Sequence, residues 1–259
     1  MIYLNIQVGD LVTRKSYNND IVFKVLSITE STVYLKGEFD RLLADSDISD
    51  LVKCDNAKDN FKVNLNLNED RSNYFYLPGK ILHIDGDVEY LERCLKFYKE
   101  NKIYAIGKKI KEEDICKQLK TLLVEFKPDI LIITGHDAYH SKNSDKNNMN
   151  NYKNSNNFVK AVKVARNYEK SHEKLVIIAG ACQSNYEALI KAGANFASSP
   201  KRVNIHALDP AIIASSIALT QTSQEVDVVD LLNKTKYGSN GMGGIITSGL
   251  MYVGYPRWI

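Results

Sequence analysis

Two residues of this sequence have side chains suited to nucleophilic catalysis, Cys182 and His136. Cys182 comes after an apolar run at residues 174–179, and His136 comes after another at residues 129–134, each with a glycine in between. A cysteine thiolate attacks carbonyl carbon, and a neighbouring imidazole favours the thiolate and later protonates the leaving amine. The pair therefore indicates chemistry at an amide or peptide bond.

A repeated alternation of strands and helices must position this pair. The apolar runs predict strands at 80–87, 102–108, 129–134 and 174–179, and helical spacing predicts helices at 88–100, 112–126, 158–168 and 185–191. Nearly continuous apolar strands separated by helices are typical of an α/β domain with a parallel sheet covered on both faces. Chemistry in such sheets collects at the carboxyl ends of the strands, and consecutive strands lie close together. We therefore expect His136 and Cys182 at one edge.

The residues after Cys182 favour a reactive thiol. Ser184 and Glu187 have the spacing of a capping box, which predicts a helix amino terminus just after the cysteine. That position favours the thiolate and leaves backbone N–H groups that could hold an oxyanion.

A structural interpretation stands beside the catalytic one. A cysteine after a buried strand is more often part of a core, and a loop histidine is usually solvated, so spacing alone leaves both open. Cys94 and Cys116 lie among apolar residues at helical spacing and are predicted to be buried hydrophobes. No C-x-x-C pair is present, so neither a zinc nor a redox motif is indicated. His140 and His206 are rival bases, ranked below His136.

The rest of the chain predicts a small domain, a connection and an insertion. Residues 1–55 are rich in short β-type runs and fit a small SH3-like β-barrel; residues 56–78 are predicted to be a connection with one strand at 61–67; residues 79–259 form the α/β domain. Residues 141–157, of which eight are asparagine, predict a mobile surface loop. The glycine-rich stretch 238–244 either brings backbone near the site or only turns the chain.

Composition narrows the range of partners. The formal net charge is +3 without a basic stripe, which does not favour a nucleic-acid partner. No apolar run approaches the ~20 residues of a membrane helix. The first residues lack the layout of a signal peptide, so we expect a cytoplasmic start.

The segments around the pair resemble the clan of cysteine peptidases that contains caspases, clostripain and gingipains. That clan shows an apolar block ending in His-Gly and a later one ending in Ala-Cys, and this chain has Gly135-His136 and Ala181-Cys182. Asp137 stands where the clan has glycine. In the clan, the backbone N–H at that position and that of the cysteine hold the oxyanion, so the resemblance implies this role for Asp137 and Cys182, and a caspase-like α/β/α fold.

Nearly the whole chain resembles the sporulation-specific YabG protease family. The resembling segments are residues 8–17, 42–47, 134–139, 179–184, 192–200 and 203–210. The resemblance implies an endopeptidase of spore coat proteins and germination-enzyme precursors, without metal or cofactor, in the mother cell and then the developing spore. Cleavage would follow a basic residue, Arg especially, which calls for a carboxylate in the substrate pocket. Asp209 and Asp137 are the candidates, although Asp209-Pro210 is also typical of a helix start.

Two further functions remain open. The chain could be a non-catalytic coat scaffold with a degenerate peptidase domain, but a scaffold has no need for both His136 and Cys182. It could also be a thiol amidohydrolase of a small amide, although a long loop beside the site suits a polypeptide better.

Overall fold

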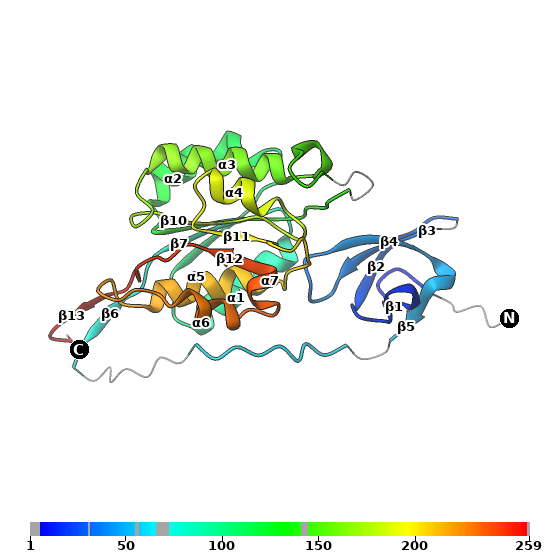
Figure 1. Ribbon diagram of the computed structural model, residues 1–259. Helices are drawn as coiled ribbons and strands as arrows, with labels where there is room; N and C mark the ends of the chain where they lie inside the picture. Colours follow the sequence, from blue (N-terminus) through cyan, green and yellow to red (C-terminus); the bar gives the residue numbers. More distant parts are fainter. Residues whose placement is uncertain (1–5, 31, 55–56, 66–72, 141–144, 258–259) are drawn as a thin grey trace. The chain divides into compact units, whose positions relative to one another are not determined.

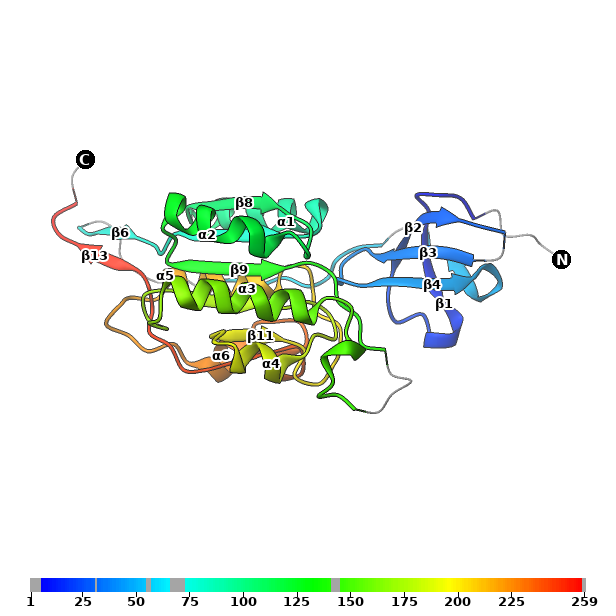
Figure 2. The same cartoon turned by 90° about the horizontal axis from the view of Figure 1, so that it is seen from above.

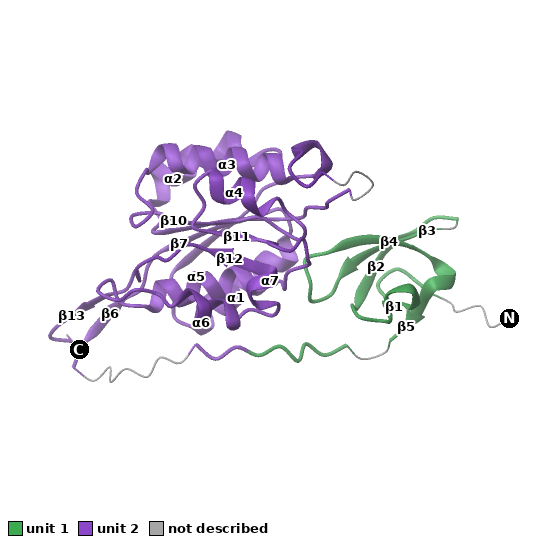
Figure 3. Ribbon diagram, in the orientation of Figure 1, with its two compact units in different colours: residues 1–62 green, residues 63–259 purple. Residues whose placement is uncertain are grey.

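The computed structural model describes residues 6–30, 32–54, 57–65, 73–140 and 145–257. The chain divides into two compact units, residues 1–62 and 63–259 (Figure 3). Each unit has its own β-sheet, and the candidate pair lies wholly in the second unit. In the described part of the chain, no helix combines the length and apolar character needed to cross a membrane.

The first unit is an antiparallel sheet. Its strands are β1 (Leu11–Arg14), β2 (Phe23–Ile28), β3 (Thr32–Gly37), β4 (Leu43–Asp47) and β5 (Leu51–Lys53), in the spatial order β4-β3-β2-β1-β5. Alternate residues bury one apolar face, with Val12, Phe23 and Leu51 fully inside. A bulge between Val25 and Ser27 shifts the register of β2 against β3. The SH3-like closure of this sheet into a barrel stays a prediction.

The second unit is built on a mixed, mostly parallel sheet. Its strands are β7 (Ile81–Asp85), β8 (Ala105–Lys109), β9 (Ile130–Thr134), β10 (Val176–Ala179), β11 (Phe196–Ser198) and β12 (Met242–Gly244), in the order β12-β11-β10-β9-β7-β8. All neighbours are parallel except β11 and β12. The α/β class is confirmed, and the antiparallel edge strand is the departure from an all-parallel sheet. A caspase-like topology stays a prediction.

Helices cover both faces of this sheet (Figures 1 and 2). They are α1 (Val88–Glu100), α2 (Ile115–Phe126), α3 (Ser155–Tyr168), α4 (Tyr186–Lys191), α5 (Asp209–Leu219), α6 (Val228–Asn233) and α7 (Gly238–Gly241). Helices α2, α3 and α4 lie on one face, where Leu119, Phe158 and Leu189 join one core cluster with the buried side chains of the central strands. Helices α1 and α5 lie on the other face.

Several elements differ from the sequence prediction, among them α3, which begins at Ser155 rather than residue 158, and β8, which begins at Ala105 rather than residue 102. Helix α2 begins at Ile115 rather than residue 112, because Glu112 lies in the preceding turn and points its carboxylate elsewhere. The predicted strand at 61–67 is wrong over residues 61–65, and residues 66–67 lie outside the described part of the chain. Strand pairing in this region starts later, where β6 (Phe75–Leu77) pairs with β13 (Tyr252–Gly254) near the carboxyl terminus.

The asparagine-rich stretch is more ordered than its composition indicates. Residues 141–144 lie outside the described part, but residues 149–151 form a short 3₁₀ helix and α3 begins at Ser155. Asn151 and Tyr152 are buried, and the Tyr152 hydroxyl donates to the Lys146 carbonyl at 2.8 Å. The prediction of a loop is therefore wrong for residues 149–151 and 155–157, which are helical, and the mobility of the stretch stays a prediction.

Candidate functional site

The candidate pair lies beyond the carboxyl ends of two adjacent parallel strands. Strands β9 and β10 pair with Ala179 opposite Ile133, so the loops that carry His136 and Cys182 leave the same edge. Hydrogen bonds join these loops: the Tyr139 N–H donates to Gln183 Oε1 at 3.1 Å, and Ser184 Oγ donates to Asp137 Oδ2 at 2.8 Å. The structure therefore brings the two loops together, as the parallel-sheet rule predicts.

The imidazole of His136 is held by an aspartate that the sequence analysis did not select. Its Nε2 lies 3.0 Å from Asp87 Oδ2, and both side chains are mostly buried, at 15% and 11% exposure. Its Nδ1 is buried and has no hydrogen-bond partner among the described residues. An imidazole bonded at one nitrogen and unpartnered at the other is equipped to take up a proton at the second.

The backbone of His136 is held by Glu112. The His136 N–H donates to Glu112 Oε1 at 2.8 Å. The same carboxylate covers Gly86 and Gly135, where a Cβ atom would collide with it. Glycine at both strand ends therefore makes room for the group that fixes the start of the His136 loop.

Gly135→Ala is expected to reduce the activity predicted for the His136 and Cys182 pair by about tenfold, while the unfolding free energy falls by less than about 1.5 kcal/mol. The new Cβ pushes away the tip of a flexible side chain, Glu112, which is cheap in stability. The His136 N–H then loses its acceptor, and a small displacement of a catalytic group is costly in rate. Thermal unfolding and initial cleavage rates of the purified variant check this. A rate loss that the loss of folded protein explains in full would contradict it.

Cys182 is fully buried, and its sulfur contacts the backbone of Ile205. The Ile205 N–H donates to Cys182 Sγ at 3.3 Å, and the Ile205 carbonyl lies 3.9 Å from the same atom. No hydrogen bond of the described residues joins this sulfur to His136. Access for a substrate in this conformation requires the segment around Ile205 to move.

The turn that carries Cys182 is held in an unusual backbone conformation. Gly180 and Gln183, on either side, have φ angles of +106° and +59°. A non-glycine residue at positive φ is sparsely populated, and such strain clusters at functional sites. The Gln183 N–H donates to the Ser199 hydroxyl at 2.9 Å and the Val203 carbonyl at 3.2 Å, which anchors the turn to the segment that covers the sulfur.

The helix start predicted from Ser184 is one residue off. Asn185 is the cap of α4, with its side chain accepting the Ala188 N–H at 3.1 Å. The Ser184 hydroxyl instead accepts the Ala181 N–H and donates to Asp137. The helix begins only at Tyr186 and is short, so its dipole adds little at the Cys182 sulfur.

The side chain of Asp137 is buried and hydrogen-bonded to several segments of the chain. It is 6% exposed, and it accepts hydrogen bonds from the backbone of Ala138 and Asn154 and from the hydroxyls of Ser155 and Ser184. Burial raises the pKa of this carboxyl above its ordinary value, more than these hydrogen bonds lower it. The Asp137 N–H donates to no other group of the described residues, which suits the predicted oxyanion role.

Asp209 is also buried and bonded within the protein. Its carboxylate accepts the His206 N–H at 2.8 Å and the Lys236 N–H at 2.9 Å, and it begins α5 with Pro210 next to it. Its role as the pocket for a basic substrate side chain stays a prediction, as does that of Asp137. Of the rival bases, His206 is buried and follows Ile205, which contacts the Cys182 sulfur, whereas His140 is exposed.

The sequence analysis missed Asp87, although one signal pointed to it. Gly86-Asp87 follows strand β7 in the same way that Gly135-His136 and Gly180-Ala181-Cys182 follow their strands. Since β7 and β9 pair in parallel with Asp85 opposite Thr134, this third strand end lies at the same edge. The glycine-rich stretch 238–244 supports the turn that carries Cys182. The Ser199 N–H donates to the Gly241 carbonyl at 2.7 Å, and the Ser199 hydroxyl accepts the Gln183 N–H.

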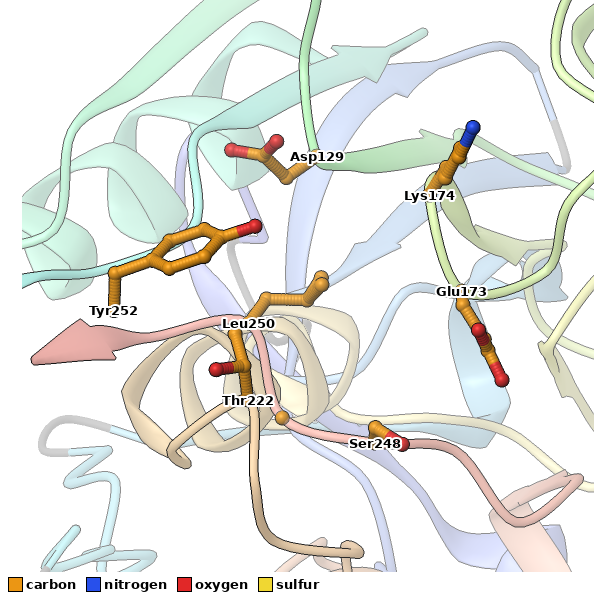
Figure 4. A pocket seen from close by; sticks show the side chains of 8 residues that line it. Asp129, Glu173, Lys174, Thr222, Ser248, Leu250 and Tyr252 are labelled. Atoms are coloured by element: carbon orange, nitrogen blue, oxygen red, sulfur yellow. The ribbon is translucent and has the colours of Figure 1, made fainter.

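A surface pocket lies at the opposite edge of the sheet. It has a volume of about 450 Å³, and Figure 4 shows Asp129 and Tyr252 across from Glu173 and Lys174. Asp129 precedes β9, and Glu173 and Lys174 precede β10, so the length of β9, about 16 Å at ~3.3 Å per residue, separates the pocket from His136. It is therefore no part of the candidate site. Among the described residues, no His, Cys, Asp or Glu cluster could hold a metal ion.

Comparison with known proteins identifies the class. A family model described as YabG peptidase U57 matches residues 7–66 and 56–256, which places the chain in a class of peptidases. The chain belongs to the YabG peptidase family. It is 40% identical over 286 aligned positions to the sporulation-specific protease YabG of Bacillus subtilis (strain 168), with 98% of this chain and 99% of the relative covered.

Proposed function

We propose that the chain is a cysteine endopeptidase in which Cys182 is the nucleophile and His136 the general base. The observation that carries this is the placement of an unpartnered, buried imidazole nitrogen and a cysteine on two hydrogen-bonded loops at one sheet edge. Of the alternatives, a scaffold has no need for His136 and Cys182 on two joined loops at the same sheet edge.

The reaction follows from the groups present. His136 Nδ1 takes the thiol proton, and Cys182 Sγ bonds to the scissile carbonyl carbon. The N–H groups of Cys182 and Asp137 hold the oxyanion. The C–N bond breaks as His136 returns the proton to the leaving amine, and water then hydrolyses the thioester and restores the thiol. The cover at Ile205 opens before the first step, because the sulfur is otherwise inaccessible.

Substrate and context follow the family. The relative is named as a sporulation-specific protease, and we propose that this chain acts in a sporulating cell, first in the mother cell and then in the developing spore. Its substrates are spore coat proteins and precursors of germination enzymes, cut after Arg or another basic residue. Asp209 and Asp137 are the proposed carboxylates that bind this basic side chain. To bind it, Asp209 exchanges the hydrogen bond that it now accepts from the His206 N–H, and Asp137 the one from the Asn154 N–H.

The test is to incubate wild-type, Cys182→Ala and His136→Ala proteins, under reducing conditions, with denatured coat proteins and to sequence the new termini. We expect cuts after Arg or Lys by the wild type alone. Equal cutting by Cys182→Ala would remove the nucleophile assignment. Cuts without basic preference would leave the pair intact and remove the acidic pocket. No cutting by any protein would favour the scaffold.

A further inference from the structure

We infer that Asp87 is the positioning residue of the site, fixing the tautomer of His136 so that Nδ1 is the basic nitrogen. This inference rests on the proposed function for its role in rate, but its geometry stands on its own. An ionised carboxylate can only accept hydrogen bonds, so the 3.0 Å contact between Asp87 Oδ2 and His136 Nε2 places the proton on Nε2. The lone pair is then on Nδ1, the nitrogen without a partner in the described residues.

Both oxygens of Asp87 have separate tasks. Asp87 is the amino-terminal cap of α1, and its Oδ1 accepts the N–H groups of Glu89 at 3.0 Å and Tyr90 at 3.3 Å. The other oxygen, Oδ2, lies 3.0 Å from His136 Nε2. The helix amides therefore fix the carboxylate plane, and the carboxylate in turn fixes the imidazole.

The surroundings keep this arrangement rigid. The Asp87 N–H donates to Asp85 Oδ1 at 2.9 Å, and Asp85 Oδ2 accepts the Thr134 hydroxyl at 2.8 Å. Asp85 thus ties the strand end that carries Asp87 to the one that carries His136. The Tyr90 ring, fully buried, packs on the imidazole with centroids 5.7 Å apart. Such support is what holds a catalytic group in its productive orientation.

Because Asp87 caps α1, a substitution that keeps the cap can test the tautomer of His136 alone. In Asp87→Asn the side-chain oxygen must stay on the α1 amides, because the flipped amide would face two N–H donors with its own NH₂ group. The NH₂ group then points at His136 Nε2 and forces the proton onto Nδ1, the wrong nitrogen. Asp87→Ser is the matched control: serine caps the helix equally well but is too short for the histidine, so neither tautomer is imposed.

Three proteins, wild type, Asp87→Asn and Asp87→Ser, are compared for cleavage of a fluorescently labelled unfolded polypeptide. We expect kcat to fall on the order of 10³-fold or more in Asp87→Asn, as for a wrong tautomer, and only about 10- to 100-fold in Asp87→Ser. KM should stay within about threefold, since the substrate contacts are untouched. Melting temperatures should agree within a few degrees, because all three residues are good caps.

The direct readout is nitrogen NMR of ¹⁵N-histidine-labelled protein in the Cys182→Ala background, which cannot process itself. The His136 signals, assigned by loss in His136→Gln, should report Nε2–H when Asp87 is present and Nδ1–H in the Asp87→Asn variant. Unchanged tautomers, or equal rate losses in both variants, would overturn the inference. Full activity of His136→Ala would instead remove the proposed base, whatever the tautomer, so the two failures are distinguishable.

Discussion

Replacement of Cys182 by alanine is expected to lower the rate of peptide-bond cleavage by about 10⁴-fold or more, the scale seen when a catalytic nucleophile is removed. The sulfur is the only atom of the residue that can form the covalent intermediate. Cys182→Ser keeps a group that can bond the Ile205 backbone but is a weaker nucleophile, so it should be nearly as inactive. Initial rates measured on one polypeptide substrate check both variants.

Cys94→Ala is the matched control for this result. Cys94 is also fully buried, in α1, and its thiol donates to the Ala207 carbonyl at 3.4 Å. Its loss should cost about 1 kcal/mol of unfolding free energy, the usual scale of one buried hydrogen bond and a small volume change. The rate per folded molecule should stay within about twofold of wild type. A large rate loss in Cys94→Ala, or none in Cys182→Ala, would show that the wrong cysteine has been chosen.

Asp137→Ala is expected to lower the free energy of unfolding on the order of 3 kcal/mol and to reduce activity strongly. The substitution removes the acceptor for four donors, from Ala138, Asn154, Ser155 and Ser184, and a buried donor without an acceptor costs roughly 1–3 kcal/mol. It also cuts the tie between the two loops that carry the candidate pair. Urea unfolding and cleavage rates measure the two effects.

Asp129→Ala provides the comparison at the opposite edge of the sheet. Asp129 Oδ2 accepts the Lys80 N–H at 2.7 Å, so its loss should cost about 1 kcal/mol. Because the residue lies far from His136, cleavage should be unaffected once folding is accounted for. A comparable loss of activity in both variants would show that the Asp137 effect is a general loss of structure.

The stability advantage of wild type over Asp137→Asn should depend on pH. Burial raises the folded-state pKa of Asp137 above the unfolded value, so the folded state binds its proton first as pH falls. The stability that Asp137 contributes is therefore complete below the pKa of the unfolded state and is lost as pH rises through the pKa of the folded state. Urea unfolding of both proteins at about pH 4 and about pH 7 should show a larger advantage at the lower pH. A larger advantage near neutral pH would mean that the hydrogen bonds outweigh burial.

The sequence by itself determined the α/β class and the sheet edge at which His136 and Cys182 lie. Helix 88–100 is predicted with the bounds of α1, because its cap and apolar spacing are local properties. The loops of His136 and Cys182 meet because parallel strands in one sheet end at the same edge. That the two residues form a catalytic pair is a prediction of the sequence that activity measurements must test.

Only the tertiary structure decided what surrounds the pair. The contact of Asp87 with His136 spans 49 residues, and that of Ile205 with Cys182 spans 23. The acceptor of the His136 N–H is Glu112, which the sequence assigned to a helix. Short-range periodicity carries no information on such partners, because they depend on strand order and on how loops pack. The fold class thus follows from local sequence patterns. The proposed His136 tautomer, the contact of Ile205 with the Cys182 sulfur and the hydrogen bond from the His136 N–H to Glu112 depend instead on residues that are distant in the sequence.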